Sequence, residues 1–514
     1  VRRATQGLAN YIIKMNGQDK GVAIAFDSRH MSPEFADEAA LCLNANGIKA
    51  YVFDSLRPTP ELSFAVRELK CIAGINVTAS HNPAEYNGYK VYWEDGAQIT
   101  PPHDVNITDA VLAITDYADA KTMDKDEAVK AGLYVQIGKD VDDKYIAALK
   151  KQVKHQDAID AVQKDIKIVY TPLHGTGNIP VRRVLKELGF ENVYVVKEQE
   201  LPDGDFPTVS YPNPEAPEAF ELALKLAKEK DADLVLATDP DADRLGVYVK
   251  DTKSGEYICL TGNMSGSFLA DYEIGQKLAL EGKLPEDGEL IKTVVTSNLV
   301  DAMAKYYGIK VTECLTGFKW IGREILRMET TGKGHYLFGF EESYGCLIGT
   351  HARDKDAIVA SMALCEAAAY YKLRGKTIWD AMLDMYEKYG YYKDNVIAIT
   401  HKGIEGLQKI QSIMDNLRKN PPMKFGNYDV TAVRDYLKDE IVNVKTGEKK
   451  PTGIPKSNVL YFELTEDAWL CVRPSGTEPK IKLYFGVVGK DLADADEKSE
   501  KLAVIVKDLL NQLG

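Results

Sequence analysis

Hydrophobic and polar positions follow one repeated order along the chain: an apolar run, an amphipathic helical pattern and further apolar runs. The first copy has apolar runs at Val22–Phe26, Ala50–Phe53 and Cys71–Val77, with a helical pattern at Ser32–Ala45. Strands that alternate with helices at this spacing are typical of βαβ units on largely parallel sheets. The N-terminal part therefore predicts an α/β domain.

The same order recurs twice. The second copy comprises Ile166–Tyr170, Pro180–Leu188, Val193–Val196 and Leu234–Ala237, and the third comprises Thr293–Thr296, Leu299–Tyr307, Lys310–Glu313 and Tyr336–Phe340. Ligands of such sheets bind where strands end and loops begin. We therefore expect a functional site in the loops that follow these strands.

The C-terminal part has a different pattern. Strand-like runs occupy Lys393–Thr400, Val459–Leu464, Trp469–Val472 and Ile481–Val488, and helical patterns lie near Ile404–Arg418 and from about Leu492 to Leu513. This pattern predicts a small mixed sheet with helices. Because 514 residues exceed what one hydrophobic core organises, we expect three βαβ-type mixed-sheet domains, 1–155, 156–285 and 286–390, and a smaller C-terminal α+β domain, 391–514.

Composition narrows the class of protein. Apolar residues make up 45% and charged residues 27% of the chain, as in an ordinary globular protein. No apolar run is long enough to predict a membrane span. The net charge of −13 counts against nucleic acid or an acidic membrane as the main partner. The seven dispersed cysteines predict reduced, buried thiols and a cytoplasmic setting.

Two loops carry candidate chemistry in the first half of the chain. The run Thr78-Ala79-Ser80-His81-Asn82-Pro83 follows an apolar run and exposes a serine at a strand end, although such a turn is also typical of a purely structural loop. The loop Asp239-Pro240-Asp241-Ala242-Asp243-Arg244 follows Leu234–Ala237. Alternate carboxylates would project to one side of an extended segment and would suit Mg²⁺, unless they form a solvated acidic turn. An EF-hand is excluded, because Arg244 and Lys250 stand where Gly and Glu are needed.

Two more loops follow in the second half. Phe340–Gly345, with Glu341 and Ser343, suits hydrogen bonds to sugar hydroxyls, and it would equally suit the cap of a helix. Arg473–Lys480 combines an arginine with small hydroxyl residues and Gly, which suits a phosphate, and a plain tight turn is the alternative.

Together these four loops resemble those of the α-D-phosphohexomutase superfamily, in the same order and over nearly the whole chain. Phe340–Gly345 followed by Arg353-Asp354-Lys355-Asp356 is most similar to the branch of bacterial α-phosphoglucomutases that also holds phosphopentomutases. The resemblance implies four domains around a central cleft. The family begins with a strand and a loop bearing Gly and Arg that are not found before Val1, so we expect the N-terminal part to be missing from this chain.

The resemblance also implies residue roles. It implies that Ser80 is the phosphoserine and a metal ligand, that Asp239, Asp241 and Asp243 hold Mg²⁺, and that Arg244 lies beside the phosphoryl group. Substrate-binding residues implied in the same way are Thr316, Gly317, Lys319, Glu341, Ser343, Lys355, Arg473, Ser475, Gly476 and Thr477. The predicted activity is interconversion of glucose 1-phosphate and glucose 6-phosphate through glucose 1,6-bisphosphate. Phosphomannomutase and phosphopentomutase are the alternatives within the family.

The accepting hydroxyl of the sugar also needs a base. Lys90 is the first candidate, on the expectation that its pKa is lowered, and His81 is the second. A Mg²⁺-dependent phosphatase with an aspartate nucleophile and a relative that binds sugar phosphates without turnover are the rival interpretations. The expected partners are small sugar phosphates.

Overall fold

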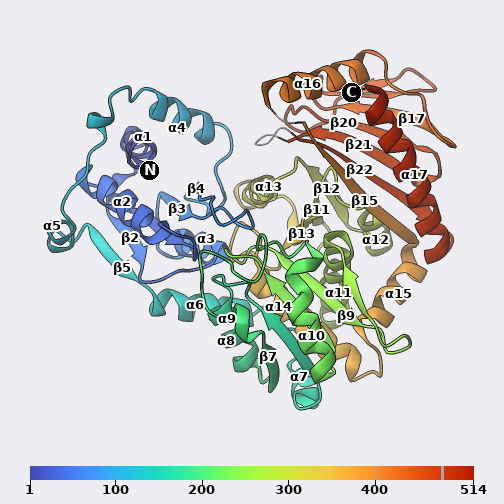
Figure 1. The fold of residues 1–514 in the computed structure, drawn as a ribbon, viewed down its shortest axis with the longest axis horizontal. Helices are drawn as coiled ribbons and strands as arrows, with labels where there is room; N and C mark the ends of the chain where they lie inside the picture. Colours follow the sequence, from blue (N-terminus) through green and yellow to red (C-terminus); the bar gives the residue numbers. More distant parts are fainter. Residues whose placement is uncertain (402, 476–479, 514) are drawn as a thin grey trace. The chain divides into compact units, whose positions relative to one another are not determined.

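The chain, described here by a computed structural model for residues 1–401, 403–475 and 480–513, forms two compact units. The first unit holds residues 1–292 and 317–381, and the second holds residues 293–316 and 382–514. Mixed sheets flanked by helices make up the first unit, and an antiparallel sheet dominates the second (Figure 1). The predicted class, mixed-sheet α/β domains followed by a C-terminal α+β domain, is confirmed.

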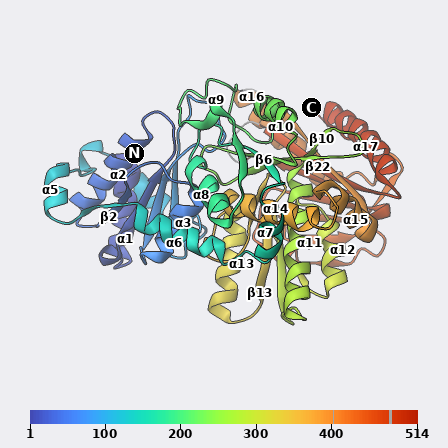
Figure 2. The same cartoon turned by 90° about the horizontal axis from the view of Figure 1, so that it is seen from below.

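The N-terminal sheet has the strand order β4-β3-β1-β2-β5, and its elements lie together in both views (Figures 1 and 2). The strands are β1 (Val22–Phe26), β2 (Ala50–Phe53), β3 (Ala73–Val77), β4 (Tyr89–Trp93) and β5 (Tyr134–Ile137). The helices around it are α1 (Arg2–Lys14), α2 (Ser32–Ala45), α3 (Thr59–Glu68), α4 (His103–Leu112), α5 (Lys125–Lys130) and α6 (Lys139–Lys150). Only β4 runs antiparallel to its neighbour.

The two faces of this sheet differ in chemistry. Ile75 and its neighbours on the same face pack with α1 and α2 in one apolar core. Gly74 lies on the other face, where Val66 of α3 is so close that a Cβ on Gly74 would stand 2.6 Å from a methyl carbon. By the same alternation, Asn76 and Lys90, which are paired in register, lie on the α3 face. Two polar side chains therefore face α3.

The second sheet has the order β10-β9-β8-β6-β7. Its strands are β6 (Lys167–Thr171), β7 (Asn192–Val195), β8 (Leu234–Thr238), β9 (Leu245–Lys250) and β10 (Tyr257–Leu260), and the helices in this part of the chain are α7 (Gln156–Val162), α8 (Asn178–Leu188), α9 (Lys197–Glu200) and α10 (Glu221–Lys230). β8 and β9 form an antiparallel hairpin. The aspartate loop connects these two strands.

A third group of strands completes the first unit. β11 (Gly288–Thr293) is parallel to β13 (His335–Glu341), which forms an antiparallel hairpin with β14 (Gly345–Leu347). The helices of this part are α11 (Gly262–Glu281), α13 (Phe318–Thr331) and α14 (Ala357–Lys372), and α15 (Ile378–Tyr389) follows.

The second unit contains a sheet of the order β15-β22-β21-β20-β17-β18-β19, with β16 paired to β17. Its elements are α12 (Leu299–Tyr307), β12 (Lys310–Cys314), β15 (Tyr391–Thr400), α16 (Gly403–Lys419), β16 (Lys424–Phe425), β17 (Tyr428–Asp435), β18 (Glu440–Asn443), β19 (Lys449–Lys450), β20 (Leu460–Leu464), β21 (Trp469–Pro474), β22 (Lys480–Gly489) and α17 (Leu492–Leu513). Helix α17 packs along β22 and β15 (Figure 1).

Most predicted elements occur within a few residues of their expected positions, but two predictions are wrong and one helix is missed. The third repeat begins at β11 rather than at Thr293–Thr296, because Val294 and Val295 lie in an apolar cluster of the second unit instead of a strand. Helix α3, between β2 and β3, was not predicted. The described pairings of the C-terminal sheet are antiparallel rather than mixed, and strands such as β20 and β21 follow one another directly in the chain.

Two further expectations concern the chain as a whole. Among the described residues, no helix is both long and apolar enough to cross a membrane. None of the seven cysteines is in a disulfide, which agrees with the predicted reduced thiols, and six of them are buried. Cys259, on the short strand β10, is the exception, because it is exposed.

Candidate active site

Ser80 lies in the turn that follows β3, with its hydroxyl aimed at the aspartate loop. Its φ of 52° is in the left-handed region, and its backbone N–H donates to Thr78 Oγ1 at 2.9 Å. Its Oγ donates to Asp239 Oδ2 at 2.8 Å and lies 3.2 Å from His81 Nδ1. The residue is half-buried. The structure thus brings the predicted nucleophile into direct contact with a predicted metal ligand.

A buried arginine holds the Ser80 loop in this conformation. Arg29, in the loop after β1, donates its guanidinium hydrogens to four backbone carbonyls of this segment, those of Ser80, Asn82, Pro83 and Tyr86. The guanidinium also pairs with Asp27 at 3.2 Å. Asp27 in turn accepts the Thr78 hydroxyl at 2.6 Å. Both side chains of this pair are 0% exposed, so the loop is fixed from inside the domain.

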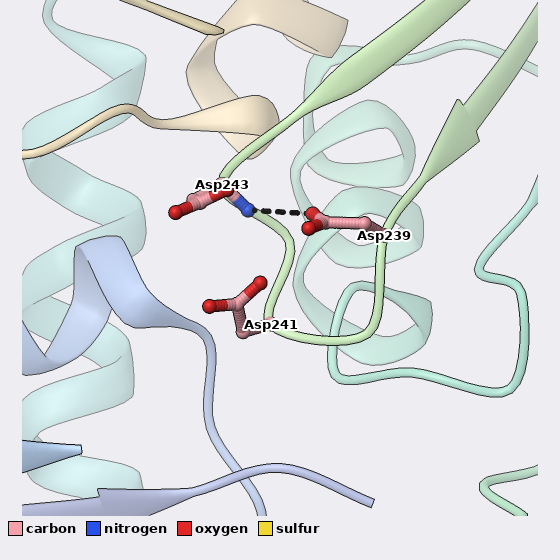
Figure 3. Close-up of side chains that lie close together, drawn as sticks. All are labelled: Asp239, Asp241 and Asp243. Carbon is pink, nitrogen blue, oxygen red and sulfur yellow. Dashed lines mark hydrogen bonds between the residues drawn. The ribbon is translucent and has the colours of Figure 1, made fainter. Parts of the chain in front are cut away.

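The aspartate loop curves back on itself instead of running extended, which corrects the sequence-based expectation. The N–H of Ala242 donates to the carbonyl of Asp239, and Ala242 has a left-handed φ of 49°. All three aspartates are nevertheless almost completely buried, and their carboxylates converge (Figure 3). Among the described residues they form a group whose ligand atoms lie within 4.8 Å of one another.

Each carboxylate has one oxygen anchored by the protein. Asp239 Oδ1 accepts the backbone N–H of Asp243 at 3.1 Å (Figure 3) and that of Arg244 at 3.0 Å. Asp241 Oδ2 accepts the Lys90 ammonium at 2.9 Å, and Asp243 Oδ2 pairs with Lys355 Nζ at 3.0 Å.

The second oxygens have different surroundings. Asp241 Oδ1 and Asp243 Oδ1 are buried and accept no hydrogen bond, and Asp239 Oδ2 contacts Ser80. Buried carboxylate oxygens without partners are costly unless a ligand satisfies them. Three hard oxygen ligands with two such orphaned atoms fit a divalent cation such as Mg²⁺.

The pKa shifts of the three aspartates also support a cation site. Burial, together with the neighbouring carboxylates, raises the pKa of Asp239 well above its usual value. Burial and Asp241 likewise raise the pKa of Asp243. Burial opposes ionisation of Asp241 too, but the ammonium of Lys90 lowers the pKa of this carboxyl below its usual value. A divalent cation would relieve the electrostatic repulsion between the three close carboxylates.

Lys90 does not have the lowered pKa that the sequence analysis expected for a base. Burial alone would lower its pKa, but Asp241 and Asp243 raise the pKa above the usual value. Its position fits a role near the phosphoryl group, since it reaches the same carboxylate cluster as Ser80. His81 lies next to the Ser80 hydroxyl. The choice between the two as base remains a prediction.

Two more predicted residues adjoin the cluster. Arg244 donates to Glu215 Oε1 at 2.7 Å, and its buried Nε, which makes no hydrogen bond, lies 3.9 Å from Asp243 Oδ1. Lys355 contacts Asp354 at 3.2 Å in addition to Asp243. Each therefore places a cation beside the three aspartates.

The two predicted sugar-binding segments meet each other. Glu341, the last residue of β13, accepts the backbone N–H of Gly317 at 2.7 Å, at the N-terminus of α13. Ser343 lies in the turn between β13 and β14, so this segment is a hairpin rather than the start of a helix. Lys319 lies on the first turn of α13, with its ammonium 5.7 Å from the centre of the Trp320 ring. Thr316 precedes Gly317 and belongs to the second unit.

The predicted phosphate-holding loop is in the second unit. Arg473 is on β21 and donates to the Tyr484 hydroxyl at 3.5 Å, and Ser475 N–H donates to Lys480 O at 2.7 Å. Gly476 and Thr477 lie outside the described residues. The assignment of this loop to a substrate phosphate remains a prediction.

Sequence reasoning missed the residues that support the site. Asp27 and Arg29 directly follow the strand Val22–Phe26, which is a charged pair at a strand end and therefore a usable signal. Thr59 precedes a proline at the start of α3, and Asn76 interrupts an apolar strand. Thr59 contacts Asp241, 182 positions away, Asn76 contacts Thr59, and Arg29 contacts the Ser80 segment more than 50 positions away, and no local pattern predicts such contacts.

Sequence profiles for phosphoglucomutase/phosphomannomutase match residues 1–118, 143–254 and 261–389 as alpha/beta/alpha domains I, II and III, and residues 418–499 as the C-terminal domain. Phosphoglucomutases of Staphylococcus saprophyticus and Staphylococcus aureus are 37% and 38% identical to 97% of this chain, which spans 88% and 87% of their lengths. The chain belongs to the phosphoglucomutase/phosphomannomutase family.

Solved structures of this family agree in fold. Parafusin, a phosphoglucomutase from Paramecium, superposes with a TM-score of 0.71 at 20% identity, covering 99% of this chain and 91% of that one. A phosphoglucomutase/phosphomannomutase family protein from Burkholderia thailandensis superposes with a TM-score of 0.69 at 20% identity, covering 99% and 93%. Membership of the family makes this chain an intramolecular phosphotransferase, and the site above is where its chemistry is expected.

Proposed function

We propose that this protein is a phosphoglucomutase that interconverts glucose 1-phosphate and glucose 6-phosphate. The observation that carries the proposal is the contact of Ser80 Oγ with Asp239 within a buried group of three aspartates. A serine in that place can carry a phosphoryl group next to a cation. The two staphylococcal relatives, which are named phosphoglucomutases, support glucose phosphates as substrates.

Asp239, Asp241 and Asp243 would hold Mg²⁺, with Ser80 as a further protein ligand. When bound, the cation supplies charge stabilisation for phosphoryl transfer. The orphaned oxygens of Asp241 and Asp243 support this assignment. Arg244 and Lys355 add fixed positive charge at the same place.

The transfer itself moves one phosphoryl group between two oxygens. The bond from phosphorus to Ser80 Oγ breaks, and a bond to a sugar hydroxyl oxygen forms. The hydroxyl proton passes to a base, and a proton returns to Ser80 Oγ. The sequence suggests Lys90 first and His81 second as this base, and the raised pKa of Lys90 counts against Lys90. The product is glucose 1,6-bisphosphate. After this intermediate turns around, its other phosphate returns to Ser80 by the reverse step.

Recognition of the substrate requires two further sets of groups. Glu341, Ser343 and the segment from Thr316 to Lys319 would bind sugar hydroxyls, and Arg473 and Ser475, with Gly476 and Thr477, would hold the phosphate that is not reacting. Mannose and pentose phosphates remain alternatives, because epimers differ by one hydroxyl. The domain limits, the central cleft, the cytoplasmic setting and the lack of a nucleic acid partner also remain predictions.

A substrate comparison tests the proposal. We expect turnover of glucose 1-phosphate to exceed that of mannose 1-phosphate and ribose 1-phosphate, with dependence on added glucose 1,6-bisphosphate. Ser80→Ala should abolish all three activities, and no amount of bisphosphate should restore them. Turnover in the Ser80→Ala variant, or release of inorganic phosphate as the main product, would contradict a mutase and favour a phosphatase.

A further inference from the structure

Thr59 makes two contacts with one metal-ligand candidate. It is the first residue of α3 and is completely buried. Its backbone N–H donates to the carbonyl of Asp241 at 2.9 Å, and its hydroxyl donates to Asp241 Oδ2 at 2.8 Å. The N–H groups of a first helical turn have no partner inside the helix. Here one of these N–H groups, that of Thr59, donates to the aspartate loop.

Asn76 sets the direction of the Thr59 hydroxyl. Asn76 Nδ2 donates to Thr59 Oγ1 at 2.7 Å, and the amide is completely buried on the α3 face of β3. A hydroxyl carries only one hydrogen. Because the amide is the donor in this contact, the hydrogen of Thr59 is directed at Asp241.

Asp241 differs from the other two aspartates in the origin of its anchors. Asp239 Oδ1 is held by backbone groups of its own loop. Asp241 Oδ2 is held by Thr59 and by Lys90, which come from α3 and β4 of the N-terminal sheet. Lys90 is a flexible cation that could follow either oxygen. The Thr59 contacts reach both backbone and side chain, so they fix how the carboxylate is turned.

We propose that Thr59 is a positioning residue for the metal, which turns Asp241 so that Oδ1 is presented to Mg²⁺, and that Asn76 acts through it. The inference rests on the proposed function, in which the three aspartates hold Mg²⁺. It also gives a physical link between the domain that carries Ser80 and the loop that carries the metal ligands. Positioning residues of this kind typically change metal affinity by about 10- to 100-fold.

The test is titration of Mg²⁺ alone into the full chain by calorimetry, without substrate. Thr59→Val keeps the shape and the backbone contact but removes the hydroxyl, and we expect Mg²⁺ to bind at least about 10-fold more weakly. Thr59→Ser retains the hydroxyl and should bind within about 3-fold of the original chain, since the hydrogen bond persists. Thr171→Val is a matched control, because the Thr171 hydroxyl is equally buried but donates to Gln199 at 2.6 Å and not to an aspartate.

The outcomes separate positioning from plain structural support. Unchanged Mg²⁺ affinity in Thr59→Val, or an equal loss in Thr171→Val, would overturn the inference and leave the metal site standing. Absence of Mg²⁺ binding in the original chain would overturn both this inference and the proposed metal site. If Thr59→Val does not fold, Asn76→Leu carries the test: we expect weaker Mg²⁺ binding because the hydroxyl loses its orientation, and an unchanged affinity would refute the proposal.

Discussion

Replacing Arg29 with Lys should impair catalysis although Arg29 reaches only the backbone of the Ser80 segment. The Arg29 guanidinium makes five polar contacts, four to carbonyls of residues 80–86 and one to the Asp27 carboxylate. A lysine keeps the charge but has three donors and no planar fork. At least two of the five contacts must therefore be lost in the Arg29→Lys variant.

The size of the effect follows from these contacts. A hydrogen bond contributes about 1 kcal/mol net, so two lost bonds amount to about 2 kcal/mol. If that energy serves to hold Ser80 in its left-handed conformation for transfer, kcat should fall about 30-fold, since each 1.36 kcal/mol corresponds to about tenfold. The same loss should lower the thermal unfolding temperature.

The assay measures both quantities for two variants. Arg57→Lys is the control, because the Arg57 guanidinium makes a two-pronged ion pair with Asp142, at 2.8 and 2.9 Å, in the same domain and does not donate to the Ser80 segment. We expect both variants to lose thermal stability and only Arg29→Lys to lose kcat. Full kcat in Arg29→Lys, or equal losses in both variants, would refute the positioning role.

Three further predictions concern charged groups of the first unit. Asp241→Asn should lower turnover by about 10²-fold or more with the fold retained, measured by kinetics at varied Mg²⁺, and full activity would show that the aspartates form only an acidic turn. Lys90→Arg keeps a cation beside Asp241 but cannot accept a proton, so kcat should fall by about 10²-fold if Lys90 is the base, whereas an active variant would leave only a structural ion pair. Burial raises the pKa of Glu273 from 4.5 to about 7, with Lys154 opposing the shift. The folded protein then holds this proton more tightly than the unfolded chain, so stability from this group is lost as pH rises from about 4.5 to 7, by roughly 3 kcal/mol. Glu273→Gln should flatten the unfolding free energy over this same pH interval.

The strands and helices of the three α/β segments were predictable because their apolar positions recur with helix or strand period. β1, α2 and β2 have the predicted bounds. The exceptions have physical causes. β11 contains the buried polar residues Glu289 and Lys292, and Glu289 pairs with Arg327 at 2.9 Å, so this strand lacks an apolar signature. The apolar pair Val294-Val295 suggested a strand where the chain instead packs into a cluster.

The candidate site was predictable only where chemistry is local in the sequence. Three aspartates within five residues, and a serine directly after a strand, are visible in the chain itself. The residues that position these side chains, Arg29, Thr59 and Asn76, are not visible in the sequence, because their contacts form only on folding. The pKa of Lys90 could not be foreseen for the same reason. Whether the Lys90 pKa is raised or lowered depends on Asp241, which is 151 positions away in sequence.

The most direct test of the proposed function is the fate of phosphate on Ser80. The full chain should be incubated with glucose 1,6-bisphosphate and Mg²⁺, and the modified residue located by intact mass and peptide mapping. We predict one added phosphoryl group on Ser80, which disappears when glucose 1-phosphate is added while glucose 1,6-bisphosphate appears. Phosphate on an aspartate with none on Ser80, or a phosphoserine that glucose 1-phosphate does not discharge, would contradict the account.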